Sequence, residues 1–141
     1  MHLSIFYFIC ESYFFINNQI HLCSSENIKR AFIIGLKYRD PQMQYSHNDC
    51  IKFRDILINQ FDFANENITL WLDKNNDGPG VYINSANIRF ELQALINISK
   101  PGDTLVFFFS GHGRKHHLSP RLNSLLLANG KFLLGNFSNT F

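Results

Sequence analysis

The 141-residue sequence has few cysteines and no large surplus of positive charge. Its three cysteines, Cys10, Cys23 and Cys50, form an odd set without C-x-x-C spacing, which argues against a disulfide scaffold and a thiolate metal site. A reducing, cytoplasmic environment fits this cysteine content better. Thirteen Lys and Arg residues against eleven Asp and Glu residues leave a net charge of +2, far below the basic footprint that a phosphate backbone requires. We therefore expect no nucleic-acid partner.

The sequence also lacks an apolar run long enough to cross a membrane. Residues 1–28 are apolar and aromatic, but Glu11 and the polar run 17–19 interrupt them, and a membrane-spanning helix needs roughly 18 apolar residues. A secretory signal would begin with positive charge and end at a small-residue cleavage site, whereas only His2 precedes this apolar run. We expect no membrane partner and interpret residues 1–28 as a poorly ordered N-terminal extension, or as the result of a start codon placed too early.

The composition is that of a folding chain. Hydrophobic residues make up 45% of the sequence and charged residues 17%, and 15 residues are Phe. Such a chain can bury a core, which excludes the disordered and collagen-like classes. Its length suits one domain of ordinary size, so we expect a single folded unit.

Apolar runs of strand length alternate with helical patterns from residue 29 onward. The continuous apolar runs at 31–36, 68–72 and 104–109 predict strands that are buried on both faces. Between them, the segments 47–61 and 84–96 carry apolar residues at helical spacing. This order predicts an α/β fold with a mostly parallel sheet and helices on both of its faces.

The two predicted helices have candidate caps and buried faces. Asn48 or Asp49 is a candidate N-cap of the first helix, and Asn84 of the second. Cys50 lies on the apolar stripe of the first helix. The residues that share one apolar face of the second helix are Ile88, Leu92, Leu95 and Ile96.

Polar segments follow two of the predicted strands at their carboxyl ends, 38–49 after the first and 110–115 after the third. In parallel sheets, substrates bind at these ends. The second segment holds His112 between Gly111 and Gly113, directly after a buried strand. An imidazole with free backbone amides beside it suits a general base. A glycine-rich turn that contains a histidine incidentally is the alternative.

Four ordered motifs resemble those of a known family: Lys29-Arg30-Ala31-Phe32-Ile33-Ile34-Gly35, His47-Asn48-Asp49, Pro101-Gly102-Asp103 and Phe109-Ser110-Gly111-His112-Gly113. Over about residues 29–115 the chain resembles the first half of a metacaspase, one of the caspase-related cysteine peptidases of fungi, plants and protists. The His-Asn-Asp variant is most similar to caspase-domain proteins of mushroom-forming fungi. The resemblance implies a caspase-like, three-layer αβα fold with a mostly parallel sheet. It also implies a cysteine-type endopeptidase that cleaves after Arg or Lys in intact relatives.

The resemblance implies roles for five residues of this sequence. His112 falls on the catalytic histidine that activates the cysteine thiol and protonates the leaving amine, and Gly113 would supply an oxyanion-hole amide. Asp49 falls on the acidic residue of the pocket for a substrate Arg or Lys, with Ser110 beside it. Ser46 stands where many members have a cysteine in that pocket. The alternative for Asp49 is a carboxylate that only stabilises the amino end of its helix.

A nucleophile is missing from the expected position. Caspase-type chemistry places the cysteine about 50 residues after the histidine, and 29 residues follow His112 in this sequence. All three cysteines precede His112, and we expect Cys50 to belong to the core. We therefore interpret 29–115 as a half-domain that is truncated before the nucleophile-bearing strand. The segment 116–141 would be an atypical tail, and we expect this chain alone to be inactive as a peptidase.

The expected partners are a peptide or protein substrate with a basic residue and, through the sheet, another chain. Without its next neighbour, the strand at 104–109 would present an uncovered apolar edge for self-association. A hairpin around Asn129-Gly130 is the alternative cover for that edge. Two other functions stay open. One is a non-catalytic caspase-like interaction module or regulatory fragment, and the other is a nucleotide-binding domain, disfavoured because no glycine-rich loop follows Leu36.

No metal or cofactor is expected in this chain. The run 73–78 matches the opening of an EF-hand loop, but Asn84 stands at the twelfth position, where the loop needs a bidentate Glu. His112, His116 and His117 have no Cys or carboxylate ligand beside them, so a zinc site is not expected either. Calcium activation of intact relatives stays open.

Overall fold

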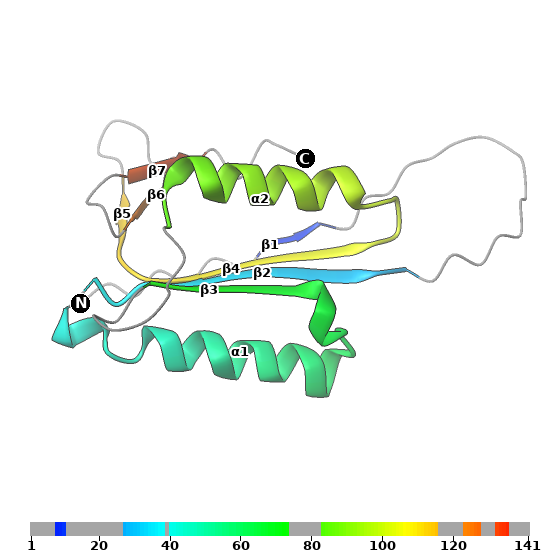
Figure 1. Ribbon diagram of the computed structural model, residues 1–141, viewed down its shortest axis with the longest axis horizontal. Helices are drawn as coiled ribbons and strands as arrows, with labels where there is room; N and C mark the ends of the chain where they lie inside the picture. The colour runs from blue at the N-terminus through cyan, green and yellow to red at the C-terminus, as the bar shows by residue number, and fades with distance from the viewer. Residues whose placement is uncertain are drawn as a thin grey trace, which may run out of the picture.

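The computed structural model describes residues 8–10, 27–38, 40–73, 83–115, 123–127 and 132–135 (Figure 1). Within these residues, a four-stranded sheet lies between two α-helices, and a three-stranded sheet lies beside one end of it. In chain order the elements are β1 (Phe8–Cys10), β2 (Lys29–Gly35), the 3-10 helix η1 (Pro41–Met43), α1 (Ser46–Phe61), the 3-10 helix η2 (Asn65–Asn67), β3 (Ile68–Leu72), α2 (Ser85–Ile98), β4 (Thr104–Ser110), β5 (Gly113–Lys115), β6 (Asn123–Leu126) and β7 (Phe132–Gly135). The predicted three-layer α/β fold is confirmed.

The carboxyl ends of β2, β3 and β4 meet at one edge of the larger sheet, whose strand order is β1-β4-β2-β3. β2 is parallel to both β3 and β4, as the alternation of strands and helices predicted. Gly35, the last residue of β2, is the register partner of Leu72 in β3 and of Ser110 in β4. The loops that leave these strands therefore begin side by side.

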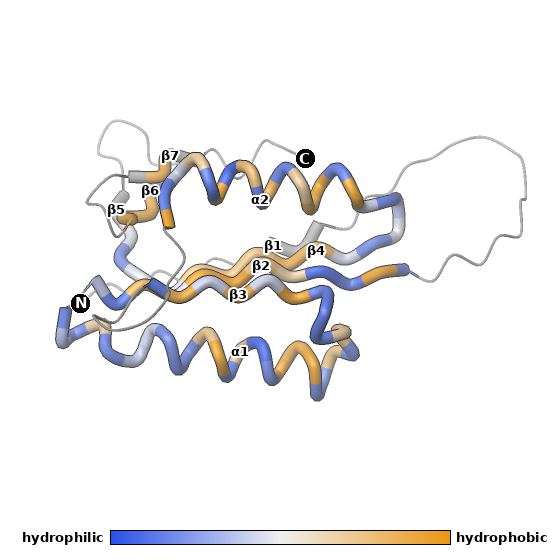
Figure 2. The backbone as a smooth tube through the Cα atoms, viewed as in Figure 1, coloured by the Kyte–Doolittle hydropathy of each residue, from blue (hydrophilic) through white to orange (hydrophobic). Residues whose placement is uncertain are grey.

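The sheet is apolar on both faces because a helix covers each of them. Successive residues of β2 enter opposite clusters: Phe32 and Ile34 face the α2 side, whereas Ala31 and Ile33 face the α1 side. All four side chains are fully buried. Figure 2 shows hydrophobic residues along β2 and β4 in the layer between the helices. This burial explains why the strand sequences show no polar alternation.

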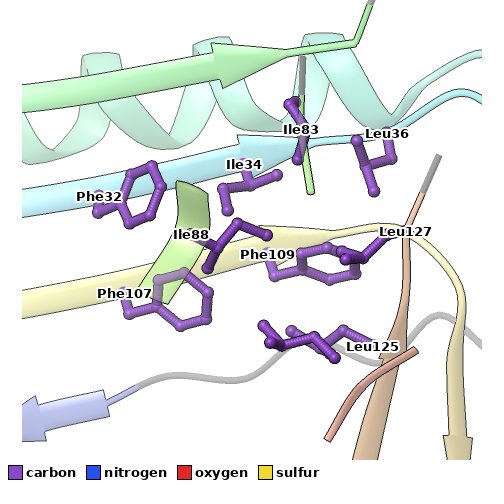
Figure 3. Packing of buried hydrophobic residues seen from close by; sticks show 10 residues of the cluster. Phe32, Ile34, Leu36, Ile83, Ile88, Phe107, Phe109, Leu125 and Leu127 are labelled. Atoms are coloured by element: carbon purple, nitrogen blue, oxygen red, sulfur yellow. The ribbon is translucent and has the colours of Figure 1, made fainter. Parts of the chain in front are cut away.

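The cluster on the α2 side includes residues from the segment 116–141. Ile88 of α2 is fully buried in it, and Leu92 and Leu95 pack against it, as the helical pattern predicted. Ile96, predicted on the same face, is 36% exposed. The remaining members of this cluster (Figure 3) are Phe32, Ile34, Leu36, Ile83, Phe107, Phe109, Leu125, Leu127 and Leu133. The segment after residue 115 thus contributes three leucines to the core.

The cluster on the other face is built on α1. Cys50 is fully buried there, as predicted, and Phe53 stacks on Phe108 of β4 with ring centroids 4.2 Å apart.

Of the predicted N-caps of the two helices, one is wrong and one is confirmed. Tyr45 occupies the N-cap of α1, without a side-chain hydrogen bond, so the prediction of Asn48 or Asp49 was wrong. At α2, Asn84 accepts a hydrogen bond from the backbone N–H of Asn87, as predicted.

β1 pairs with the outer edge of β4 and runs antiparallel to it. Phe8 is the register partner of Phe107, and Cys10 of Leu105. The expectation of an uncovered β4 edge is therefore wrong for this stretch of the strand. The covering strand comes from the segment 1–28, which precedes β2 in the chain.

β5, β6 and β7 form the smaller antiparallel sheet. β6 pairs with β7 from Asn123↔Gly135 to Leu126↔Phe132, which confirms the predicted hairpin pairing, although Asn129-Gly130 lie outside the described residues. The hairpin pairs with β5, not with the edge of β4. None of the helices in the described ranges is long and apolar enough to span a membrane.

Candidate active site

The two segments predicted to carry function leave the sheet at neighbouring points. The backbone N–H of Leu36 donates to the carbonyl of Ser110 at 2.9 Å, which extends the pairing of β2 and β4 by one residue. After that contact the chain turns away on both sides. Residues 37–38, 40–49 and 111–115 therefore lie together at the carboxyl ends of the parallel strands, the position where we expect the site.

The first turn of α1 packs directly on the end of the sheet. A Cβ atom added to Gly35 would lie 2.8 Å from Cys50 Sγ and 3.2 Å from the carbonyl oxygen of Ser46, so this approach requires glycine. Ser46 and Ser110, both predicted pocket residues, are 2% and 1% exposed at this junction. Ser110 Oγ is buried without a hydrogen-bond partner among the described residues.

Asp49 lies in the same first turn of α1 and is half-buried. Its backbone N–H donates to the carbonyl of Tyr45 at 2.9 Å, and its carboxylate accepts no hydrogen bond from the described residues. Burial raises the pKa of the Cys50 thiol to about 12, and the negative charge of Asp49 contributes to the shift. Cys50 therefore stays protonated at neutral pH and is no candidate nucleophile.

His112 lies just beyond β4 with its imidazole beside a carboxylate that the sequence did not single out. His112 Nε2 is 3.2 Å from Asp40 Oδ2. Because a carboxylate only accepts, Nε2 must be the donor in this contact. The Tyr38 ring lies against the same imidazole, with ring centroids 4.9 Å apart. Asp40 belongs to the polar segment 38–49 that follows the first predicted strand, but the sequence did not distinguish it from the other residues of that segment.

Asp40 is held in place by its own loop. Its Oδ1 accepts the backbone N–H of Gln42 at 2.9 Å, which caps η1. This hydrogen bond holds the pKa of Asp40 below its ordinary value, and His112 contributes in the same direction. The group facing Nε2 is therefore a carboxylate throughout the neutral range.

The Tyr38 hydroxyl joins the backbone of His112 to β6. It accepts the backbone N–H of His112 at 3.0 Å and donates to the carbonyl of Leu126 at 2.6 Å. The N–H of Leu126 in turn donates to the carbonyl of His112 at 3.0 Å. In a hydrogen-bonded antiparallel pair, each residue donates its N–H to the carbonyl of the other. In the pair of His112 and Leu126, the Tyr38 hydroxyl bridges one of these two bonds, from the N–H of His112 to the carbonyl of Leu126.

The pairing of His112 with Leu126 determines the direction in which the N–H of Gly113 points. Hydrogen-bonded and non-hydrogen-bonded pairs alternate along an antiparallel ladder. Since His112 and Leu126 form a hydrogen-bonded pair, the next pair, Gly113 and Leu125, is a non-hydrogen-bonded one. The N–H of Gly113 therefore points away from β6. It is free of the β5–β6 ladder, as an oxyanion donor must be.

Asp73 ties the His-Asn-Asp motif to the loop that carries Tyr38. Its carboxylate accepts the backbone N–H groups of Lys37 at 2.8 Å and Tyr38 at 2.9 Å, and it contacts His47 Nε2 at 2.6 Å. These bonds support Tyr38 at a φ of 54°, in the left-handed region. In the sequence, Asp73 opens the run that matches the start of an EF-hand loop, and no local pattern indicates its contacts with His47 and Tyr38.

The calcium and zinc candidates fall mostly on residues that the structure does not describe. Residues 74–80 lie outside the described ranges, and so do His116 and His117. Within those ranges, no group of three His, Cys, Asp or Glu side chains is placed to hold a metal ion. The carboxylate of Asp73 is already engaged by His47 and two backbone amides.

The comparisons with known proteins match this chain to one family. A family profile described as a metacaspase, peptidase C14 domain, matches residues 29–124. The chain is 36% identical to Metacaspase-7 of Arabidopsis thaliana over 89 residues, which cover 62% of this chain and 22% of that protein. It is 34% identical to Metacaspase-1 of Plasmodium falciparum over 91 residues, which cover 62% of this chain and 15% of that protein. For Metacaspase-1 of Arabidopsis thaliana the values are 35% over 89 residues, with 62% and 24% covered. The matched part is thus less than a quarter of the length of these relatives.

Proposed function

Because this chain belongs to the metacaspase family of C14 peptidases, we propose that it supplies the histidine-bearing part of a cysteine-type endopeptidase. The observation that supports this most is the setting of His112. Its Nε2 is engaged by Asp40, and its Nδ1 forms no hydrogen bond with the described residues. A half-exposed imidazole with one nitrogen held and the other unengaged is arranged as a base.

The proposed chemistry uses two groups of the segment after β4. His112 takes the proton of a cysteine thiol, and the resulting thiolate adds to the scissile carbonyl carbon. The oxyanion that forms accepts a hydrogen bond from the N–H of Gly113. When the tetrahedral intermediate collapses, the imidazolium gives its proton to the leaving amine, and water later hydrolyses the thioester.

The attacking thiol is not Cys50. That thiol is fully buried in the α1 cluster, and its pKa is raised to about 12. We propose that the nucleophile is a cysteine other than Cys10, Cys23 and Cys50, and that the 141-residue chain alone does not turn over peptides. The site of His112 would then act together with a thiol from another segment or another chain.

We also propose that the substrate carries Arg or Lys at the cleavage site. Asp49 offers a half-buried carboxylate without a hydrogen-bond partner among the described residues, in the same first helical turn as Ser46. Ser46 and Cys50 both lie against Gly35, whose partner in the sheet is Ser110, so two of the predicted pocket residues, Ser46 and Ser110, lie at one strand end. A cationic side chain entering there would meet a charge and a buried hydroxyl.

Three further points are proposals. The sequence led us to expect a half-domain of residues 29–115, and we propose a larger folded unit that also includes β1, β6 and β7, since β1 pairs with β4 and Leu125 and Leu133 pack in the main core. Self-association would use the part of the β4 edge beyond its pairing with β1. A cytoplasmic location rests on the small, odd number of cysteines.

A chimera tests the proposed function directly. Residues 29–124 replace the matched segment of the Arabidopsis Metacaspase-1, and cleavage of fluorogenic peptides ending in Arg, Lys or Asp is measured beside the parent protein. We expect cleavage after Arg and Lys only. Replacing Asp49 with Asn should reduce kcat/KM for the basic peptides by at least tenfold without changing alkylation by a small thiol reagent. A folded chimera that cleaves none of these peptides, although the parent does, contradicts the proposal.

A further inference from the structure

We propose that Asp40 is a positioning residue for His112. Its carboxylate accepts a hydrogen bond from Nε2–H and thereby leaves Nδ1 as the nitrogen that receives the thiol proton. The inference rests on the proposed function, since a positioned base has a use only in a catalytic site. It assigns a role to a side chain in the loop after β2.

The contact itself defines which nitrogen carries the proton. Asp40 Oδ2 and His112 Nε2 are 3.2 Å apart, and the two side chains are 34% and 35% exposed. A carboxylate has no proton to donate at neutral pH, so the neutral imidazole beside it holds its proton on Nε2. Nδ1 then carries the lone pair. An unpositioned histidine would instead interconvert between both tautomers.

The carboxylate is fixed before it meets the imidazole. Asp40 Oδ1 accepts the N–H of Gln42 at 2.9 Å, so the second oxygen alone faces His112. The backbone of Asp40 is held as well, because its N–H donates to the carbonyl of Lys37 at 2.8 Å and its carbonyl accepts the N–H of Met43 at 2.9 Å. A residue whose carboxylate and backbone are both held can orient a neighbour instead of following it.

Tyr38 restrains His112 from a second direction. Its ring lies against the imidazole, tilted by 31° between the planes, and its hydroxyl accepts the backbone N–H of His112 at 3.0 Å. The loop 37–40 therefore fixes both the backbone and the ring of His112. With the ring face occupied by Tyr38 and Nε2 by Asp40, the imidazole has one preferred orientation.

A contribution to folding stability does not by itself explain the contact between Asp40 and His112. Ion pairs between partly exposed side chains contribute little to folding stability. Asp55, paired with Arg54 on α1 and 48% exposed, is a matched surface carboxylate without a histidine partner. A purely structural role would make Asp40→Ala resemble Asp55→Ala in every measurement.

The test uses the 141-residue chain labelled with ¹⁵N-histidine. Imidazole ¹H–¹⁵N spectra locate the ring proton of His112, assigned by its loss in His112→Gln, and report how fast it exchanges with water. We expect the proton on Nε2 in the wild type and exchange that is roughly tenfold faster in Asp40→Ala. Asp40→Asn, whose amide oxygen still accepts but carries no charge, should fall between them, and Asp55→Ala should match the wild type.

Two results overturn the inference: a ring proton on Nδ1 in the wild type, or equal exchange rates in the wild type and both Asp40 variants. If Asp40→Ala does not fold, the wild-type proton position and the Asp40→Asn rate decide the outcome. None of these readouts needs peptidase activity. An inactive chimera would therefore count against the proposed function alone, and an unchanged exchange rate against the role of Asp40 alone.

Discussion

The hydroxyl of Tyr38 accepts the backbone N–H of His112 at 3.0 Å, across 74 residues of sequence. The same hydroxyl donates to Leu126 at 2.6 Å, so the loop after β2 holds both the histidine and the strand that follows it. Burial raises the pKa of Tyr38, which keeps this hydroxyl protonated and able to donate. The placement of His112 therefore depends on a tyrosine of another loop.

Removing that hydroxyl should cost stability. Tyr38→Phe leaves the N–H of His112 and the carbonyl of Leu126 without their partner, and an unsatisfied buried group costs about 1–3 kcal/mol. We expect a fall of that size in the free energy of unfolding, measured by urea denaturation. Tyr45→Phe is the matched control, because Tyr45 is 63% exposed. Equal effects of the two substitutions would contradict the bridging role of Tyr38.

Gly111 should not tolerate a side chain while the Tyr38 hydroxyl is present. An added Cβ would lie 2.5 Å from Tyr38 Oη and 2.8 Å from the Phe109 ring. We expect Gly111→Ala to destabilise the chain by about 1–3 kcal/mol. In the Tyr38→Phe background the penalty should be smaller, because one of the two clashes is gone. Strictly additive losses in the double-mutant cycle would show that the two residues do not interact.

The parts of the fold that follow from local sequence were predictable. β2 and β4 are buried on both faces, so every position in their centres had to be apolar, and a continuous apolar run is a recognisable pattern. The cap at Asn84 and the buried position of Cys50 also follow from spacing within a few residues. His112 was identifiable because two glycines flank it at the end of such a run.

The contacts that shape the site were not predictable, because they join distant segments. Asp40 and His112 are 72 residues apart, and nothing in the local sequence of either one specifies the other. No local pattern indicates the pairing of Phe8 with Phe107 either, because a three-residue strand is too short to show an alternation of apolar and polar residues. The same holds for Leu125 and Leu133, whose burial depends on the position of α2 over the sheet.

Asp103 should make the stability of the chain depend on acid pH. Burial alone would raise its pKa, but hydrogen bonds from the backbone N–H groups of Ile28 and Lys100 and from Arg30 outweigh it and hold the pKa below the ordinary 3.8. The stabilisation is therefore complete above pH 3.8 and is lost as pH falls through the lower pKa of the folded state. Asp103→Asn should lose stability at neutral pH and show a shallower decline as the pH falls below 3.8.

The comparison for this prediction is Asp55→Asn, which removes an exposed carboxylate whose ion-pair partner among the described residues is its neighbour Arg54. Its stability profile against pH, measured by urea denaturation at each pH, should follow that of the wild type. If Asp103→Asn keeps the wild-type profile as well, Asp103 does not carry the acid dependence.

The thiol of Cys50 should be inert in the folded chain. Its pKa is raised to about 12, so its thiolate fraction at pH 8 is on the order of a thousandfold below that of a free cysteine. A variant with Cys10→Ser and Cys23→Ser leaves this thiol alone for reaction with a disulfide reagent. We expect rapid labelling in urea and very slow labelling in buffer. Rapid labelling of the folded variant would reopen Cys50 as a nucleophile.

The most direct measurement is the turnover of a basic peptide by the chimera of residues 29–124 with and without His112. General acid–base catalysis by a positioned side chain contributes a factor of about 10²–10⁴. We predict that His112→Ala lowers kcat by at least 10² with KM changed less than threefold, and that the melting temperature of the chimera stays the same. A His112→Ala chimera that is folded and keeps more than a tenth of its kcat would contradict the assignment of His112 as the catalytic base.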